Sequence, residues 1–189
     1  GKTNILQEIK QKGYDVLDLE KCANHRGSLL GGIGLGGDAT QKNFEAYVMD
    51  SILKSKSDII FTEGESKRIG SVVMPNYLFE EVFNARKFFI ETDMDKRVEI
   101  IRKEYLKESY DENEIFEALE KLGRYIGEKR KNEYIEELKN KEFDKVIKDL
   151  MENYYDNAYK TKSHTFEKTF HNADEEKCAE DIIKYVFGI

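Results

Sequence analysis

The sequence predicts an α/β fold in which helices cover both faces of a parallel sheet, followed by a helical part. The chain opens on Gly1-Lys2-Thr3, which matches the end of a phosphate-binding loop of the form G-x-x-x-x-G-K-[ST]. Patterns typical of buried strands and amphipathic helices then alternate up to residue 108, and from residue 111 the pattern is mainly helical. We therefore predict a P-loop NTPase-like three-layer parallel sheet in residues 1–108 and a helical extension in residues 109–189.

The opening tripeptide carries the first candidate chemistry. In a phosphate loop the backbone N–H groups and the lysine ammonium hold phosphate oxygens, and the following hydroxyl ligates Mg²⁺. Gly1, Lys2 and Thr3 are thus candidate phosphate-binding residues, and Thr3 is also a candidate metal ligand. The alternative is an ordinary helix N-terminus without a ligand. We expect the first glycine of the loop and its strand to lie upstream of residue 1.

Composition restricts the class of protein. The 189 residues are 39% hydrophobic and 37% charged, which indicates a globular rather than a disordered chain. No apolar run approaches the ~20 residues that a membrane span needs. Two cysteines make no disulfide framework, so we expect a cytoplasmic protein. The formal net charge of −7 argues against indiscriminate nucleic-acid binding, and we expect no DNA partner.

The first elements follow from apolar spacing. Three apolar residues on one face predict a helix over residues 4–12, which Gly13 ends. Alternating apolar residues over 14–19 predict a buried strand. A glycine-rich run at 29–37 formally contains G-x-G-x-x-G, but a polar segment separates it from the strand, so we reject a dinucleotide site. We expect a flexible loop over a ligand. Helical spacing then resumes over 41–54.

Three further strands and two helices complete the predicted sheet region. An apolar run over 58–62 predicts a second buried strand, which ends in an acid-rich turn. Residues 71–74 are strand-like and end at Pro75, after which Asn76 caps a helix that runs to about residue 85. The last strand and helix of this region are predicted over 87–92 and 93–107.

The remainder is predicted to be helical with one exception. Two apolar stripes, which begin at Ile115 and Phe143, indicate helices that build a core. Residues 159–170 alternate weakly and predict an edge strand, and 174–187 form a last amphipathic helix. We expect this final segment to pack back on the sheet.

Candidate site residues follow the strand ends. Glu63 and Glu65 come directly after the second strand, where an α/β sheet carries its ligand chemistry, and either could reach Mg²⁺ or a phosphate-bound water. The alternative is ion pairing with Lys67 and Arg68 to close a turn.

Two further candidates lie in the polar loop after the first strand. Arg26 could bind phosphate through its planar guanidinium, and His25 could act as acid or base. Both could equally be surface residues. Cys22 and His25 have a C-x-x-H spacing, but no second pair accompanies them, so we exclude a zinc site and take Cys22 and Cys178 as structural.

Four motifs follow one another in the first part of the chain. The first is Leu17-Asp-Leu-Glu-Lys-Cys-Ala-Asn-His-Arg-Gly-Ser28. A Gln-x-x-Phe-Glu helix follows at 41–45, a strand ending in E-x-E-S-[KR]-x-I-G follows at 63–70, and a strand with proline follows at 74–75. In this order the set resembles the nucleotide-loop domain of the tRNA 2-selenouridine synthase family. The order over residues 1–75 makes the resemblance specific, whereas the helical remainder matches only in general character.

The resemblance implies a tRNA-modifying transferase. Such enzymes S-prenylate a wobble 2-thiouridine with geranyl diphosphate and then replace the geranylthio group with selenium from selenophosphate. Their catalytic cysteine belongs to a rhodanese domain, which we expect as a fused or separate partner. Bound Mg²⁺ and the phosphate loop would stabilise the leaving diphosphate.

The resemblance also implies residue roles. Glu63 or Glu65 would hold the metal or its waters, with Glu63 as the candidate ligand, and His25 and Arg26 complete the catalytic candidates. The phosphate-binding candidates are Gly1, Lys2, Thr3, Arg26, Ser28, Ser66 and Arg68. The glycine-rich loop could cover the prenyl tail. The candidates for tRNA contact are Lys121, Arg124, Lys129, Arg130 and Lys131, although a solvated helix face also explains them.

Two other functions stay open. A small P-loop kinase acting on a metabolite or nucleoside would use the same Lys2 and Thr3 with ATP. A non-catalytic tRNA- or nucleotide-binding module would leave all chemistry to its partner. The "HRGS" and "ESKRIG" segments favour the transferase, because a generic kinase needs neither.

Overall fold

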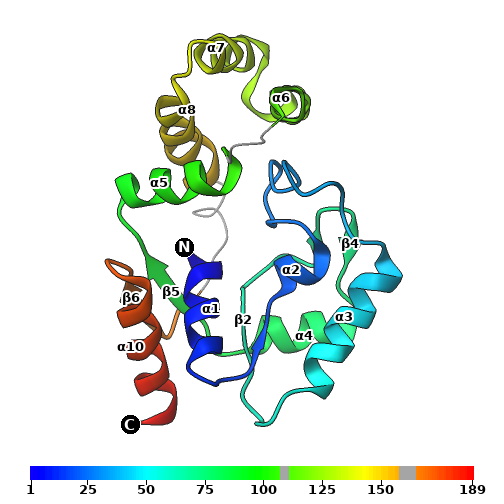
Figure 1. Ribbon diagram of the computed structural model, residues 1–189, viewed down its shortest axis with the longest axis vertical. Coiled ribbons are helices and arrows are strands. Elements are labelled where there is room, and N and C mark those ends of the chain that lie inside the picture. The colour runs from blue at the N-terminus through cyan, green and yellow to red at the C-terminus, as the bar shows by residue number, and fades with distance from the viewer. Residues whose placement is uncertain (107–110, 158–164) are drawn as a thin grey trace. The chain divides into compact units, whose positions relative to one another are not determined.

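The computed structural model describes residues 1–106, 111–157 and 165–189 (Figure 1). The chain forms two compact units: unit 1 comprises Gly1–Thr92 and Phe166–Ile189, and unit 2 comprises Asp93–Thr165. The boundary lies one helix earlier than residue 108, because the helix after Thr92 packs on another helix of unit 2. No helix in the described parts of the chain is long and apolar enough to cross a membrane.

Unit 1 alternates helices with short strands. Its first elements are α1 (Lys2–Gln11), β1 (Val16–Leu17), α2 (Leu19–Ala23), α3 (Gln41–Leu53) and β2 (Phe61–Thr62). They are followed by β3 (Arg68–Ile69), β4 (Val72–Val73), α4 (Asn76–Asn84) and β5 (Phe88–Glu91). The C-terminal segment adds β6 (Lys168–His171) and α10 (Glu175–Phe187).

The described strands form three separate pairs. β1 pairs with β2 in parallel, with Val16 opposite Phe61, and β5 pairs with β6 in parallel, with Phe88 opposite Lys168. β3 and β4 form a small antiparallel hairpin. The α/β class is confirmed, but one continuous three-layer sheet is not shown by these ladders.

Several strands are shorter than the sequence predicts. The strand expected over 14–19 stops at Leu17 because Asp18 becomes the N-cap of α2, where its carboxylate accepts the Lys21 N–H at 2.8 Å. The acid-rich turn after β2 contains β3, which the sequence did not predict. The edge strand expected over 159–170 is present at its end as β6, while 159–164 lie outside the described residues.

One hydrophobic cluster of unit 1 lies under α1 and α10, which run side by side (Figure 1). Ile5 and Ile9 of α1 and Ile182 of α10 are almost fully buried in it. Strand residues from both parallel pairs pack against the same cluster, namely Val16, Phe61, Phe88, Ile90 and Phe170. The last segment of the chain therefore packs on the strands, and one helical layer covers both pairs.

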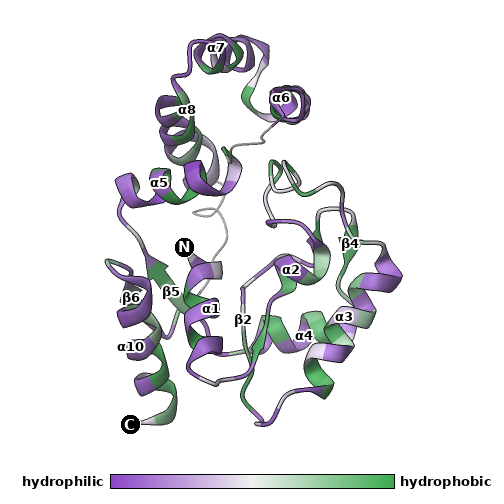
Figure 2. Cartoon of the chain, in the orientation of Figure 1, coloured by the Kyte–Doolittle hydropathy of each residue, from purple (hydrophilic) through white to green (hydrophobic). Residues whose placement is uncertain are grey.

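A second cluster lies on the other side of β1. Leu17 and Leu19 pack there with Phe44 of α3 and Met74, and Ile60 lies at its edge. Successive strand residues Val16 and Leu17 thus enter different clusters, as the alternation of a strand requires. Figure 2 shows hydrophobic segments along β4, β5 and the inner side of α3.

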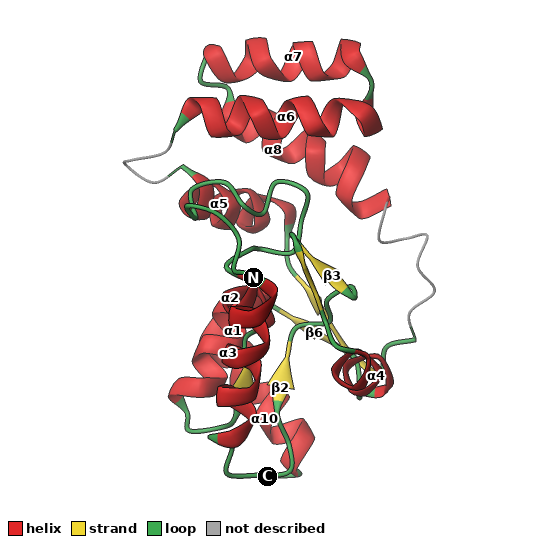
Figure 3. Cartoon of the chain, turned by 90° about the vertical axis from the view of Figure 1, so that its right-hand side faces the viewer, coloured by secondary structure: helices red, strands yellow, loops and turns green. Residues whose placement is uncertain are grey.

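Unit 2 is helical in its described part. Its elements are α5 (Met94–Tyr105), α6 (Glu112–Ile126), α7 (Glu128–Lys139), α8 (Phe143–Leu150) and the π-helical turn η1 (Met151–Tyr155). α6 packs along α7, and α7 packs on α8 (Figure 3). The apolar stripe of α6 is buried through Ala118, Leu119 and Leu122. The first predicted stripe is therefore buried as expected. Of the second stripe, Leu150 is buried, while Phe143, Ile147 and Tyr154 are half-buried.

Candidate anion-binding site

The first turn of α1 presents the opening motif. Gly1 is the N-cap, and its carbonyl accepts the Ile5 N–H at 3.2 Å. Burial of Ile5, Leu6 and Ile9 fixes the helix on its cluster and sets the direction of the N-terminus. Lys2 and Thr3 therefore lie at the positive end of the helix dipole, which favours an anion.

Two carboxylates from the strand ends contact this turn. The Lys2 Nζ lies 3.1 Å from Glu65 Oε1, and the Thr3 hydroxyl donates to Glu20 Oε2 at 3.0 Å. The Lys2 side chain is 45% exposed, while that of Glu65 is 7% exposed. Solvent therefore reaches the ammonium, and Glu65 supplies its counter-ion from the protein side.

Glu63 is the most deeply placed acid of the site. Its carboxylate is 2% exposed, and Oε2 accepts the Leu19 N–H at 3.0 Å. Among the described residues, Oε1 has no hydrogen-bond partner. Burial, aided by the charges of Asp18 and Glu20, raises the pKa of Glu63 to about 8.

The pKa of Glu20 is also raised, although less than that of Glu63. Burial raises the pKa of Glu20 to about 7, the charges of Glu65 and Asp18 act in the same direction, and Lys2 and Thr3 oppose them. Glu20 and Glu65 share the one ammonium of Lys2, and the charge of Glu20 also acts on Glu63. Glu20 and Glu63 therefore retain protons near neutral pH and would release them to a bound cation.

His25 is buried and holds one defined tautomer. Its Nδ1 accepts the Gly27 N–H at 3.2 Å, so only Nε2 carries a proton in the neutral ring. Burial lowers the pKa of His25, and the charges of Asp38 and Glu65 only partly counteract this. His25 is therefore a neutral imidazole at pH 7, which fits a hydrogen-bonding role better than a charged one.

Two glycines make room for this imidazole. An added Cβ at Gly31 would lie 2.8 Å from His25 Cε1, and one at Gly70 would lie 2.7 Å from His25 Cδ2. The same Gly70 Cβ would lie 2.6 Å from Asp38 Oδ2, which accepts the Ser71 N–H at 2.7 Å. His25 thus connects the loop after α2 with the β3–β4 hairpin.

The glycine-rich loop is tied down, which corrects the expectation of a flexible cover. Arg26 Nη1 donates to the Ile33 carbonyl at 2.7 Å, and Asn24 Nδ2 donates to the carbonyls of Leu35 and Gly37 at 2.9 and 2.7 Å. Ile33 is 7% exposed. The loop closes on itself because side chains of the preceding turn satisfy its carbonyl groups. Arg26 is therefore engaged in holding the loop.

The phosphate candidates divide into two groups. Gly1, Lys2 and Thr3 lie on the first turn of α1, with the acids beside them. Gly27 is also close, since a Cβ there would lie 2.5 Å from Glu65 Oε2. Ser66 instead donates to the Arg68 carbonyl at 2.6 Å on the β3–β4 hairpin. Arg68 lies on the same hairpin, opposite Val73.

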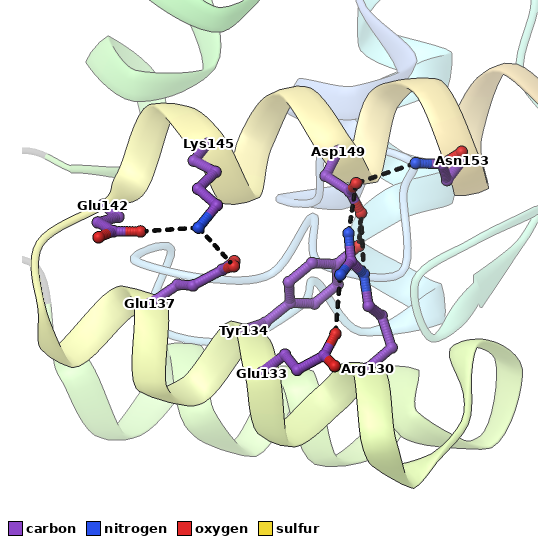
Figure 4. A network of polar contacts seen from close by, with 8 residues as sticks. All are labelled: Arg130, Glu133, Tyr134, Glu137, Glu142, Lys145, Asp149 and Asn153. Carbon is purple, nitrogen blue, oxygen red and sulfur yellow. Dashed lines mark hydrogen bonds and ion pairs between the residues drawn. The ribbon is translucent and has the colours of Figure 1, made fainter.

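The tRNA candidates also divide. Lys131 is 6% exposed, and its Nζ lies 2.7 Å from both Glu120 and Glu128. Arg130 bonds Glu133 and Asp149 (Figure 4). Both cations hold helices of unit 2 together. Lys121, Arg124 and Lys129 are exposed, as expected for residues that contact a partner.

Glu20 was not singled out from the sequence. It lies in the first turn of α2, three residues after the end of β1, and thus near the same kind of strand end that drew attention to Glu63 after β2. Parallel pairing of β1 with β2 brings these two ends together. Asp38 was missed as well, because it lies in a glycine-rich loop without any strand or helix pattern.

Comparison with known proteins decides the family. The profile of the tRNA 2-selenouridine synthase AAA domain matches residues 1–186. The chain belongs to this family. The tRNA 2-selenouridine synthase of Nitrosomonas eutropha is 36% identical over 110 residues, which cover 56% of this chain and 28% of that protein. The enzyme of Hydrogenovibrio crunogenus is 29% identical over 182 residues, which cover 84% of this chain and 49% of that protein.

A third member of the tRNA 2-selenouridine synthase family, from Aeromonas salmonicida, is 33% identical over 109 residues, which cover 56% of this chain and 28% of that protein. This family member thus spans a quarter to a half of the length of these relatives. No solved structure matches the chain.

Proposed function

We propose that this chain is the phosphate-loop domain of a tRNA-modifying transferase that converts wobble 2-thiouridine to 2-selenouridine through an S-geranyl intermediate. The observation that carries the proposal is the first turn of α1, where Lys2 and Thr3 meet Glu20 and Glu65. Family membership supplies the reaction class. Both steps require recognition of a phosphorylated group, geranyl diphosphate in the first and selenophosphate in the second.

Lys2 is the residue that gives the site its preference for an anion. Departure of diphosphate develops negative charge on its oxygens, and a positioned ammonium at a helix N-terminus stabilises that charge. Glu65 holds the ammonium in place at 3.1 Å until an anion competes for it. The exposed position of Lys2 lets a substrate reach it without opening the core.

A divalent cation fits the donor set in part. Thr3 Oγ1 and the unpartnered Glu63 Oε1 are oxygen donors of the kind that Mg²⁺ prefers. The described residues contain no cluster of three acidic, histidine or cysteine side chains that would hold a metal alone. Mg²⁺ commonly takes one or two protein oxygens and fills the rest with waters and phosphates. When bound, it would neutralise the charge of the leaving diphosphate.

The nucleophilic cysteine is proposed to lie outside this chain, in a rhodanese domain of the complete protein or of a partner. Burial raises the pKa of Cys22 to about 11, so its thiol stays protonated at neutral pH. Cys178 is 2% exposed in the cluster under α10. Neither position suits a thiolate that must reach a substrate.

The fold proposal is that both parallel pairs of unit 1 belong to one three-layer sheet. Support comes from the helices, because α1 and α10 cover strand residues of both pairs through a single hydrophobic cluster. α3 and α4 pack on the opposite side of β1. Parallel strands buried on both faces are the usual architecture of such sheets.

A reconstitution with the complete protein tests the function. The protein is incubated with 2-thiouridine tRNA, geranyl diphosphate and selenophosphate, and the nucleosides are analysed by mass. We expect geranylated and then selenated uridine. Neither product, together with ATP-dependent phosphorylation of a small acceptor, would show a kinase instead. Binding of tRNA without any product, even when the rhodanese domain is supplied, would leave only a binding module.

A further inference from the structure

Tyr125 is an exposed aromatic residue of α6. It is 67% exposed, and it is the one large exposed hydrophobic residue within the described part of unit 2. It lies at the edge of the buried stripe of α6, three residues after the buried Leu122. Most of its surface is nevertheless left in solvent.

A second tyrosine supports the ring. The ring centroids of Tyr125 and Tyr154 lie 6.2 Å apart at an interplanar angle of 58°. Tyr154 belongs to η1, the π-helical turn that follows α8. Such turns often mark functional positions. Tyr154 thus restricts the position of the Tyr125 ring while leaving most of it in solvent.

Three exposed cations flank this ring. Lys121 lies one turn before Tyr125 on the same face of α6, and Arg124 lies three residues after Lys121 on the adjoining face. Lys129 follows at the start of α7. In the described part of the chain, none of the three has an acidic partner. Glu117 is an exposed acid one turn before Lys121 on the same face of α6. The positively charged part of this face therefore begins at Lys121.

The buried ammonium of Lys131 forms ion pairs with the acids nearest to these cations. Its Nζ lies 2.7 Å from Glu120 and from Glu128, the two acids adjacent in sequence to Lys121 and Lys129. Gly123 allows this course, since an added Cβ there would lie 2.8 Å from Lys131 Cδ. The buried ammonium balances one of these two carboxylates. The three exposed cations therefore exceed the remaining carboxylate and Glu117 by one positive charge around Tyr125, in a chain of net charge −7.

We propose that Tyr125 stacks on an unpaired base of an RNA loop while Lys121, Arg124 and Lys129 hold the neighbouring phosphates. An aromatic ring between cations is the usual platform for single-stranded nucleic acid, because every base has a face on which it stacks. A duplex offers no free base face. The proposal rests on the proposed function, which supplies a tRNA loop as substrate, and it assigns to unit 2 the binding of that loop.

The test measures affinity of the full-length protein for an anticodon stem–loop and for the same stem closed as a continuous duplex. Tyr125→Ala is expected to weaken loop binding roughly 5- to 100-fold, the range for one base stack, and to leave duplex binding unchanged. Tyr125→Phe keeps the ring and should bind the loop like the unmodified protein. Tyr77→Ala, which removes an equally accessible tyrosine from α4 at 55% exposure, is the matched control and should have no effect.

The salt dependence provides a second, independent measurement. Replacing Lys121, Arg124 or Lys129 by Ala should lower the slope of log K against log salt by about 0.7 each, as for lost phosphate contacts to a single strand. Unchanged loop affinity of Tyr125→Ala, in a protein that still selenates tRNA, would overturn the stacking site and leave the proposed function standing. Loss of loop binding in Tyr125→Phe would also overturn stacking. Failure of the unmodified protein to bind tRNA would overturn both.

Discussion

Glu63 is buried with one carboxylate oxygen lacking a partner, so its protonation is linked to folding. The folded protein holds this proton up to pH 8, whereas the unfolded chain releases it near the ordinary glutamate value of 4.5. Between those values the folded state binds more protons, so raising the pH destabilises it. We predict that the free energy of unfolding falls between pH 4.5 and 8, by about 1.4 kcal/mol for each unit of pKa difference.

Glu63→Gln should remove most of this decline, because the amide carries no charge and can still accept the Leu19 N–H. Glu20, with a pKa raised to about 7, should retain a smaller decline of the same sign between pH 4.5 and 7. Urea unfolding at half-unit pH intervals measures both. The exposed Glu80→Gln is the control. An identical pH dependence in Glu63→Gln and the unmodified protein would contradict this explanation.

The backbone conformation at Gly70 and the side chains around it require a glycine at this position. Its φ is +55°, and an added Cβ would lie 2.6 Å from Asp38 Oδ2. We predict that Gly70→Ala lowers the free energy of unfolding by roughly 1–3 kcal/mol. Gly64→Ala, six residues earlier with nothing within 4 Å of its Cβ, should change it by less than about 1 kcal/mol. Equal unfolding midpoints in urea would show that His25 and Asp38 do not need this space.

Sequence patterns find residues where a motif or a strand end marks them. Lys2 and Thr3 were predicted from the Gly-Lys-Thr tripeptide, and Glu63 and Glu65 were predicted from their position after a strand. The structure pairs Lys2 with Glu65 and joins Thr3 to Glu20 by a hydrogen bond. Glu63 is connected to them through the charge of Glu20. Glu20 could not be selected in the same way, because its part in the cluster depends on the pairing of β1 with β2.

One carboxylate, that of Asp149, makes most of the polar contacts between α7 and α8 that Figure 4 shows. Asp149 accepts hydrogen bonds from Arg130, the Tyr134 hydroxyl and Asn153 (Figure 4). The Arg130 guanidinium holds the pKa of Asp149 below its ordinary value. Tyr134 is 1% exposed, so its hydroxyl would lose its acceptor inside the core if Asp149 were removed.

We predict that Asp149→Ala lowers the free energy of unfolding by about 1–3 kcal/mol and speeds hydrogen exchange of α7 and α8 amides. The matched control on the same helix is Asp144→Ala. Asp144 pairs with Arg102 at 3.3 Å, and both side chains are 59% exposed, so the loss should stay below about 1 kcal/mol. If the two variants exchange alike, the network in Figure 4 does not hold these helices.

Helices were predicted better than strands or loops. Apolar spacing located α1, α3, α4, α5 and α10 within a few residues and found the stripes of α6 and α8, because each of these helices buries a stripe. It did not single out α2 or α7. Strand ladders need partners, so the lengths of β1 and β2 could not follow from one segment. The glycine-rich loop was expected to be flexible, since composition does not reveal that Asn24 and Arg26 satisfy its carbonyls.

At the scale of the molecule, the two ends of the chain meet in unit 1. α1 and α10 share one cluster, and β6 completes a parallel pair with β5. The return of the last segment was predicted, but the boundary between the units was placed one helix too late. α5 follows a strand in the sequence, as a helix of the sheet region would, but it packs on α8 of unit 2. Only contacts in three dimensions assign such a helix to a unit.

The central claim is that the first turn of α1 binds the phosphorylated substrates through Lys2. Calorimetric titration of the full-length protein with geranyl diphosphate, in the presence of Mg²⁺, tests it most directly. We compare the unmodified protein, Lys2→Ala and Lys12→Ala; Lys12 lies just after the last turn of α1, where it pairs with Glu176 and Glu180. Lys2→Ala should weaken binding at least 10-fold, and Lys12→Ala should leave it unchanged. Equal affinities of all three proteins would contradict the claim.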